Sequence, residues 1–174
     1  MTPITLKFCP QCGSIGFQFR EHRYWYCPVC LFTYFHNVAS SASVIIEIDE
    51  KVLMIRRKLN PGLGMLSLPG GFVDPGERAE DAAVRECREE TGVNARILSF
   101  VGSWPNDYEY KKVKYSTCDL FFSAAIQDGS AMPEADGSEI DEICLVPFAD
   151  IPRARIAFES TRRAIQSWLA GRGK

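Results

Sequence analysis

The residues from Gly71 to Val93 contain an acidic run whose spacing could hold a metal ion. Within it, Glu86, Glu89 and Glu90 stand at positions i, i+3 and i+4, so a helix would gather their carboxylates on one face within about a turn. Like charges this close repel each other, and a hard divalent cation that prefers oxygen ligands would offset them. The alternative is a solvent-exposed face on which neighbouring arginines form salt bridges. The spacing alone leaves both interpretations open.

A second set of potential ligands lies near the N-terminus, where two Cys-x-x-Cys pairs are separated by fourteen residues. Each pair turns sharply enough to direct two thiolates at one ion, and four thiolates make a closed tetrahedral zinc site. A module this small cannot bury enough apolar surface to be stable alone, so we expect the metal to be structural. Iron and a redox dithiol are the alternatives. The predicted zinc ligands are Cys9, Cys12, Cys27 and Cys30.

The remaining cysteines and the composition narrow the class of protein. Cys87, Cys118 and Cys144 are isolated in apolar segments, so we expect buried side chains rather than disulfides. The formal net charge of −2 gives no basic field for non-specific nucleic-acid binding. No apolar run approaches the roughly 18 residues that span a bilayer, and the first residues lack the features of a signal peptide. We therefore expect no membrane association and a cytoplasmic location.

The chain divides into two predicted modules, a cysteine-rich one at residues 1–36 and a larger one at residues 37–174, with a linker near 36–41. The aromatic segment 17–26 predicts a hairpin in the first module. In the second, mixed apolar strand patterns with two helical patterns favour an α/β/α layered fold. We expect a hairpin at 42–58, strands at 65–69, 93–104, 115–126 and 143–148, and helices at 77–91 and 159–170.

The acidic run is part of a longer pattern. Five residues separate Gly71 from Glu77, and seven more precede the run "RECREETGV", which begins at Arg85. This order matches the Nudix box, G-x5-E-x7-R-E-U-x-E-E-x-G-U, at every fixed letter, with Cys87 in place of the usual bulky aliphatic residue. The second module therefore resembles the Nudix hydrolases. The resemblance implies an α/β/α sandwich with a mixed sheet, in which the box forms a loop, a helix and a loop.

The resemblance also implies a metal site. In that family, carboxylates matching Glu86, Glu89 and Glu90 bind Mg²⁺ or Mn²⁺, and the backbone carbonyl at Gly71 often joins them. Divalent ions neutralise diphosphate oxygens and lower the pKa of a bound water. The expected reaction is hydrolysis of a nucleoside diphosphate linked to another moiety, which gives a nucleoside monophosphate and a phosphorylated product.

Two further roles follow from the resemblance. The positions of Glu77 and Arg85 pair with each other and brace the loop of the box. A carboxylate must take the proton of the attacking water, and Glu89 and Glu139 are both candidates for this base.

A cysteine module directly before a Nudix domain resembles the NADH pyrophosphatase group. That group carries an E-[IL]-x-E segment before its last strand, which "SEIDEICLVPF" matches through Glu139 and Glu142; the alternative is an acidic loop facing solvent. The group's S-Q-P-W-P-F-P-x-S signature is missing, because this chain has "GSWPNDYEYKKVKYSTCDLFF" there. Leu145 also replaces a tryptophan that is frequent in the group.

The segment that replaces the signature is rich in aromatic residues. Trp104, Tyr108 and Tyr110 could stack on a nucleobase, or they could form a cluster that packs on the core. The sequence leaves both open, and we expect the loop from Trp104 to Tyr115 to decide the substrate.

Three functions remain after this reading. The first is a pyrophosphatase acting on ADP-ribose, NADH or a similar nucleotide, with Mg²⁺ or Mn²⁺ at the box and Zn²⁺ in the cysteine module. The second is an enzyme that removes a nucleotide cap from RNA with the cysteine module holding the strand, and the lack of a basic stripe counts against it. The third is a non-catalytic nucleotide sensor, and the intact box counts against it. The NADH pyrophosphatase resemblance leaves a homodimer open.

Overall fold

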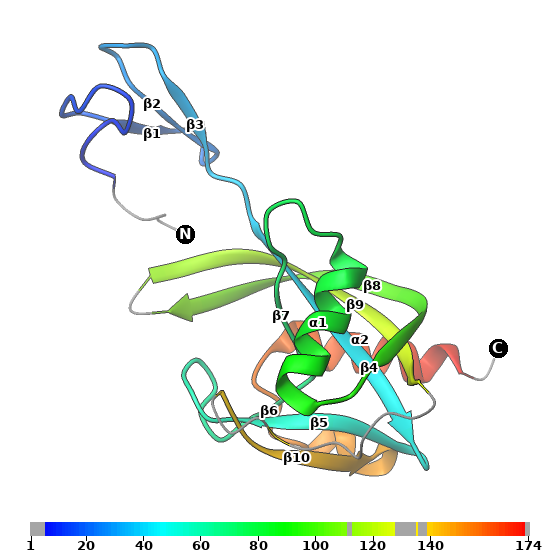
Figure 1. The fold of residues 1–174 in the computed structure, drawn as a ribbon. Coiled ribbons are helices and arrows are strands. Elements are labelled where there is room, and N and C mark those ends of the chain that lie inside the picture. The colour runs from blue at the N-terminus through cyan, green and yellow to red at the C-terminus, as the bar shows by residue number, and fades with distance from the viewer. Residues whose placement is uncertain (1–5, 111–112, 128–134, 136–138, 173–174) are drawn as a thin grey trace.

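The computed structural model describes residues 6–110, 113–127, 135 and 139–172, and these residues form two modules (Figure 1). The first is a three-stranded antiparallel sheet of β1 (Gln18–Arg20), β2 (Tyr24–Tyr26) and β3 (Thr33–Phe35). Its small core stacks Phe17 on Trp25, with ring centroids 5.6 Å apart, beside two buried cysteines. The hairpin predicted at 17–26 is confirmed, whereas β3 is too short to give a periodic pattern.

The second module is built on a seven-stranded mixed sheet with the order β10-β5-β4-β9-β8, to which β6 adds beside β5 and β7 beside β4. β4 and β9 run parallel, and the other neighbouring strands are antiparallel. The strands are β4 (Ala39–Ile48), β5 (Lys51–Arg57), β6 (Leu66–Ser67), β7 (Gly70–Phe72), β8 (Ala95–Tyr110), β9 (Val113–Ile126) and β10 (Ile140–Pro147).

The two helices cover opposite faces of this sheet (Figure 1). Alternate residues of β4 explain why, because successive side chains of a strand point to opposite faces. Val44 and Ile46 pack in the cluster that contains Ala83 and Cys87 of α1 (Ala79–Thr91). Ile45 belongs to the cluster of α2 (Glu159–Gly171), which a short 3-10 helix, η1 (Phe148–Arg153), precedes. The predicted α/β/α sandwich with a mixed sheet is confirmed.

Small side chains bring α1 close to the sheet. Ala82, Ala83 and Cys87 are fully buried on the inner face of the helix. The helix ends as the sequence predicts, because Gly92 adopts the left-handed conformation with φ 70° and its N–H donates to the Arg88 carbonyl. It begins two residues later than predicted. Glu77 lies in the preceding turn, where its N–H donates to the Asp74 carbonyl.

Two expectations about irregular segments were wrong. Residues 39–41, assigned to a linker, are the start of β4, because Ala39 pairs with Thr117 and Ser41 with Phe72. The expected loop from Trp104 to Tyr115 is the continuation of β8 and β9 as a hairpin, which extends as far as the pair Tyr110 and Val113. Pro105, Asn106 and Asp107 are residue types that strands disfavour, which is why the sequence favoured a loop here.

Within the described residues, no helix is long and apolar enough to cross a membrane. The cytoplasmic location, the homodimer and the boundary between residues 36 and 37 stay predictions.

Candidate functional site

The site begins where the backbone of β7 passes beneath α1. A side chain at Gly70 would lie 2.3 Å from the Ala42 carbonyl oxygen, and one at Gly71 would lie 2.5 Å from the carboxylate of Glu86. Gly70 also has φ +151°, a conformation that other residues rarely adopt. Glycine is therefore required at residue 70, where a side chain would meet the backbone of β4, and glycine at residue 71 lets the strand approach the Glu86 carboxylate without displacing it.

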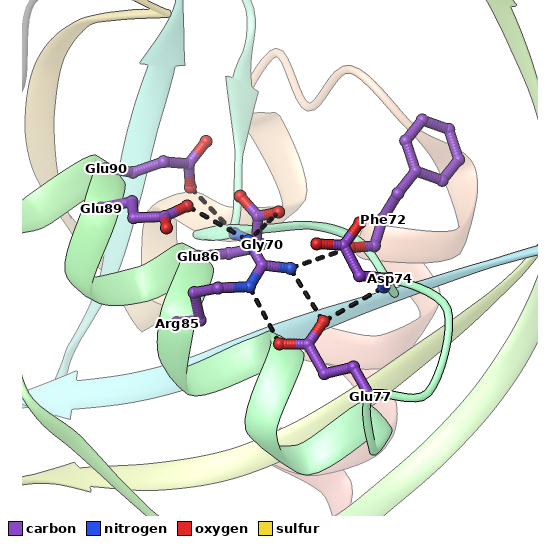
Figure 2. Close-up of polar contacts among 8 residues, drawn as sticks. All are labelled: Gly70, Phe72, Asp74, Glu77, Arg85, Glu86, Glu89 and Glu90. Carbon is purple, nitrogen blue, oxygen red and sulfur yellow. Dashed lines mark hydrogen bonds and ion pairs between the residues drawn. The ribbon is translucent and has the colours of Figure 1, made fainter.

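Arg85 organises the acids around it (Figure 2). Its Nε and Nη2 donate to the two oxygens of Glu77 at 2.9 and 3.0 Å, and Nη2 also donates to the Phe72 carbonyl oxygen at 3.2 Å. Its Nη1 donates to Glu86 at 2.8 Å and to Glu89 at 3.1 Å. One guanidinium thus joins the loop of the box to the acidic face of α1.

The electrostatics of the predicted brace follow from these contacts. Hydrogen bonds from Arg85, and then from the N–H of Asp74, lower the pKa of the Glu77 carboxyl. The same pairing, first with Glu77 and then with Glu86, raises the pKa of Arg85. Glu77 is therefore a fixed anion that holds Arg85 against the helix.

Glu86 and Glu90 are the buried acids of the face. Burial raises the pKa of Glu86, although Arg85 opposes the shift. Glu90 is 8% exposed and accepts one hydrogen bond, from the N–H of Gly70 at 2.9 Å. Burial, together with the nearby charge of Glu86, raises the pKa of Glu90 to about 8. Arg85 is the ion-pair partner of Glu86, and Glu90 makes no ion pair among the described residues, so a divalent cation would supply the charge that these buried carboxyls still need.

Glu89 and Glu139 complete the acidic group. Glu89 is exposed, and Glu139 approaches from the start of β10 closely enough to raise the pKa values of Glu86 and Glu90. Glu142, the second acid of the predicted segment, turns away and binds Arg56 at 2.7 Å. In the described part of the chain, no three of these carboxylates bring oxygen atoms within 4.8 Å of one another. The sulfurs of four cysteines in the first module do lie that close together.

All four acids open into one cleft of about 450 Å³. A second cavity of about 530 Å³ adjoins it, and both are lined by Arg57, Glu90 and Glu139. The first is the more polar cavity and contains several hydroxyl groups. The second is bounded by aromatic and aliphatic side chains, namely Leu59, Phe72, Tyr108, Tyr115 and Ile140.

The three aromatic residues proposed as substrate contacts have different positions. Tyr108 lines both cavities, and its ring lies 5.4 Å from that of Phe72 and 5.9 Å from that of Phe158. Trp104 instead packs edge-on against Phe121 at 5.7 Å in the core beneath α2, and it does not line either cavity. The side chain of Tyr110 lies outside the described part of the structure.

Sequence reasoning missed most of the polar cleft lining. Asp119 is 6% exposed within β9, next to Thr117 and beside Ser41 of β4. The available signal was a polar residue at alternate positions of an otherwise apolar strand, which places an acid on a buried face. Arg57 and Phe158 had no such pattern, because they come from segments far apart in the sequence.

The predicted zinc ligands meet in the first module. The four sulfurs of Cys9, Cys12, Cys27 and Cys30 lie within 4.8 Å of one another, and two of the separations are 3.7 Å. Tetrahedral Zn–S bonds of about 2.3 Å would place sulfurs roughly 3.8 Å apart. A hydrogen bond with Ser14 lowers the pKa of Cys27 to about 6. Against a backbone hydrogen bond from Phe32, burial and the neighbouring thiols raise the pKa of Cys30, so a bound cation would be needed to hold all four cysteines as thiolates.

Comparisons with known proteins agree with this geometry. The family model described as "NUDIX domain" matches residues 37–169. A crystal structure of a NUDIX hydrolase from Nitrosomonas europaea is 26% identical, with a TM-score of 0.75, and the match covers 97% of this chain and 93% of that one.

Two relatives of this chain have names that state an activity. The "NAD-capped RNA hydrolase NudC" of Pseudomonas putida is 30% identical over 170 residues, which is 95% of this chain but only 57% of the relative. The "ADP-ribose pyrophosphatase" of Methanocaldococcus jannaschii is 53% identical over 58 residues, which is 33% of this chain and 34% of the relative. The chain thus spans little more than half the length of its long relative.

The contacts of Arg85 lead to a stability prediction. Replacing Glu77→Gln should lower the urea midpoint of unfolding, because Arg85 loses the anion that holds it. Glu80→Gln is the matched control, since Glu80 makes an exposed 3.5 Å ion pair with Arg78 and a weak first-turn interaction with the helix dipole, and it should lower the midpoint much less. Equal midpoints for the two variants would show that the Glu77–Arg85 pair does not brace the loop.

Proposed function

The chain belongs to the NUDIX domain family, and from this premise we propose that it hydrolyses the diphosphate linkage of a nucleotide such as ADP-ribose or NADH. The observation that carries the proposal is the cleft in which Glu86, Glu89, Glu90 and Glu139 face Arg57 and the aromatic side chains. The products would be a nucleoside monophosphate and a phosphorylated second moiety.

The residues fit a divalent cation. Glu90 is a buried acid with a pKa near 8 and a single hydrogen bond, and Gly71 leaves no room for a side chain beside Glu86. We assign Mg²⁺ or Mn²⁺ to Glu86, Glu89, Glu90 and the carbonyl of Gly71, because carboxylates and carbonyls are the ligands these ions prefer. When bound, the ion would neutralise diphosphate oxygens and activate a water.

The chain's own residues then have separable tasks. Arg85 holds Glu86 and Glu89 in orientation, and Glu77 holds Arg85. Arg57 brings a positive charge to the cleft, where its Nε donates to the Pro61 carbonyl at 2.7 Å and its guanidinium lies over Phe158. This fixed cation would meet the diphosphate. Glu89 or Glu139 would accept the proton of the attacking water.

The shape of the cleft supports a substrate with two organic ends. The two cavities share Arg57, Phe72, Glu90, Tyr108 and Glu139, and of these we assign Arg57, Glu90 and Glu139 to the diphosphate and its metal, so that each cavity could hold one end of the substrate. A dinucleotide or nucleotide-sugar has this arrangement, with one group on each side of the linkage. Tyr108 and Phe72 would offer aromatic faces to whichever ring lies between them.

The named relative favours a second candidate, removal of an NAD cap from RNA. The bond cleaved would be the same, and the cysteine module could contact the attached strand. A net charge of −2 gives the chain no general basic field for RNA, so free nucleotides remain our first choice.

Turnover assays with Mg²⁺ or Mn²⁺ test the reaction. We expect cleavage of ADP-ribose or NADH, and Glu89→Gln should lower kcat about 10²- to 10⁴-fold, because it removes a ligand or the base. Asp81→Asn, on the exposed first turn of α1, is the control and should keep full activity.

Three outcomes would redirect the assignment. Wild-type protein that binds ADP-ribose but leaves it, NADH, FAD and diadenosine polyphosphates uncleaved would favour the sensor. A kcat/KM that is higher for NAD-capped RNA than for free NADH would favour the cap-removing enzyme. Full activity in Glu89→Gln would contradict its assigned role.

Metal binding should depend on pH. Because burial places the pKa of Glu90 near 8, above the value of an unfolded glutamate, the metal-free fold loses stability as pH rises from about 4.5 to 8. A cation must displace this proton, so its stabilising effect should grow over the same range. We expect added Mg²⁺ to raise the Tm of zinc-loaded protein more at about pH 9 than at about pH 6. An equal increase at both pH values would contradict a cation bound at Glu90.

The cysteine module should contain zinc. Elemental analysis of purified protein is expected to find about one zinc per chain, and Cys12→Ser should lower that content. A strong chelator should unfold the first module. Trp25 packs beside the cysteines, so unfolding should expose it to water and change the tryptophan fluorescence of the protein. Cys118→Ser is the control because that thiol lies in β9. A metal-free chain with native fluorescence would show that the four cysteines are not a zinc site.

A further inference from the structure

A buried polar cluster occupies the inner end of the cleft, on the face of the sheet that α2 covers. On the same face of β9 as the apolar Phe121, Asp119 lies two residues before it and Thr117 four residues before it. Along β4 the equivalent change is from Ile45 to serines, and Ser41 pairs directly with Asp119. The core thus gives way to hydroxyl and carboxylate groups at the point where the cleft begins.

Three hydroxyl groups donate to the Asp119 carboxylate. Ser41 and Thr117 donate to Oδ1 at 2.7 and 2.6 Å, and Ser160 of α2 donates to Oδ2 at 2.7 Å. These bonds offset the cost of burying the charge. None of the carboxylates that we assign to the metal takes part in them, so the cluster has no role in the hydrolysis derived above.

The numbers of hydroxyl protons and lone pairs determine which hydrogen bonds this cluster can make with a ligand. A serine or threonine hydroxyl has one proton. That of Ser41 is directed at Asp119, and that of Thr117 at Asp119 at 2.6 Å rather than at the Asn106 carbonyl oxygen at 3.4 Å. The remaining lone pairs of Ser41 and Thr117, and that of Asp119 Oδ2, can only accept. These three residues line the cleft, so the cluster that they form presents acceptors and no hydroxyl donor, while Ser43 and Asn106 line the same cleft beside it.

Such a surface favours a ligand whose facing edge carries hydrogen-bond donors. The amino group of adenine or cytosine would be satisfied there, whereas a carbonyl at the same position would face acceptors and lose its hydrogen bonds to water. An aromatic wall stands next to the cluster: in β8 and β9, Asn106 pairs with Thr117 and Tyr108 with Tyr115, and Tyr108 contacts Phe158. A planar base could therefore stack on Tyr108 while its edge reaches the cluster.

We infer that Ser41, Thr117 and Asp119 form a base-reading subsite that selects a nucleobase carrying an exocyclic amino group over one carrying a carbonyl at that position. The inference rests on the proposed function for its substrate class, and it names the part of the cleft that discriminates among nucleotides. Asp119 is a positioning residue here, because it acts largely by fixing the direction of the hydroxyl protons.

The test compares adenine with hypoxanthine, in which a carbonyl replaces the exocyclic amino group and the adjacent ring nitrogen carries a proton. In a direct binding titration, AMP should bind the wild-type protein about 10- to 100-fold more tightly than IMP. In turnover assays, kcat/KM should favour ADP-ribose over IDP-ribose by a similar factor. The binding arm needs no hydrolysis, so a failed reaction and a failed subsite give different results.

Variants separate base reading from structural support. Asp119→Asn frees hydroxyl protons and adds an amide donor, so the preference should fall to about threefold or less, with IMP binding improved. Thr117→Val keeps the side-chain shape and removes one acceptor, which should also reduce the preference even if Asp119→Asn fails to fold. Ser123→Ala is the matched control, because Ser123 bonds Ser99 at 2.7 Å on the same strands but outside the cleft.

Equal affinity of the wild-type protein for AMP and IMP would overturn the inference. So would folded Thr117→Val and Asp119→Asn proteins that weaken both ligands by the same factor, since a structural role alone predicts that result.

Discussion

The contact between the β7 backbone and the carboxylates of α1 is the constraint on which the rest of the site depends. Gly70 donates to Glu90, and Gly71 lies so close to Glu86 that no side chain fits between them. This contact requires β7 to pair with β4 and α1 to lie close against the sheet, which Ala83 and Cys87 permit. Acids are thereby buried in the fold with too little positive charge, and a cation offers the missing compensation.

The sequence predicted the parts of the site that lie close together along the chain. Within one helix, spacing alone brings Glu86, Glu89 and Glu90 together, and the pairing of Arg85 with Glu77 follows from the box. The position of Trp104 could not be predicted, because a strand residue can face either the core or the cleft, and only the register of β8 against β9 decides between them.

The same limit applies to the inner end of the cleft. Ser41, Asp119 and Ser160 are far apart in the sequence, and a parallel strand pair and the packing of α2 bring them together. Fold class was predictable because apolar periodicity is local, as in β4. The substrate-reading surface was not, since it depends on tertiary contacts among residues that have no motif. The residues assigned to the reaction therefore come from a local motif, whereas those assigned to selectivity come together only through tertiary contacts.

Anomalous diffraction from crystals of the protein soaked with Mn²⁺ and AMP tests the central claim most directly. We predict a manganese peak bounded by Glu86, Glu89, Glu90 and the carbonyl oxygen of Gly71, at metal–oxygen distances of about 2.0–2.4 Å. A crystal in which manganese binds elsewhere in the protein and leaves these carboxylates without a metal would contradict the account.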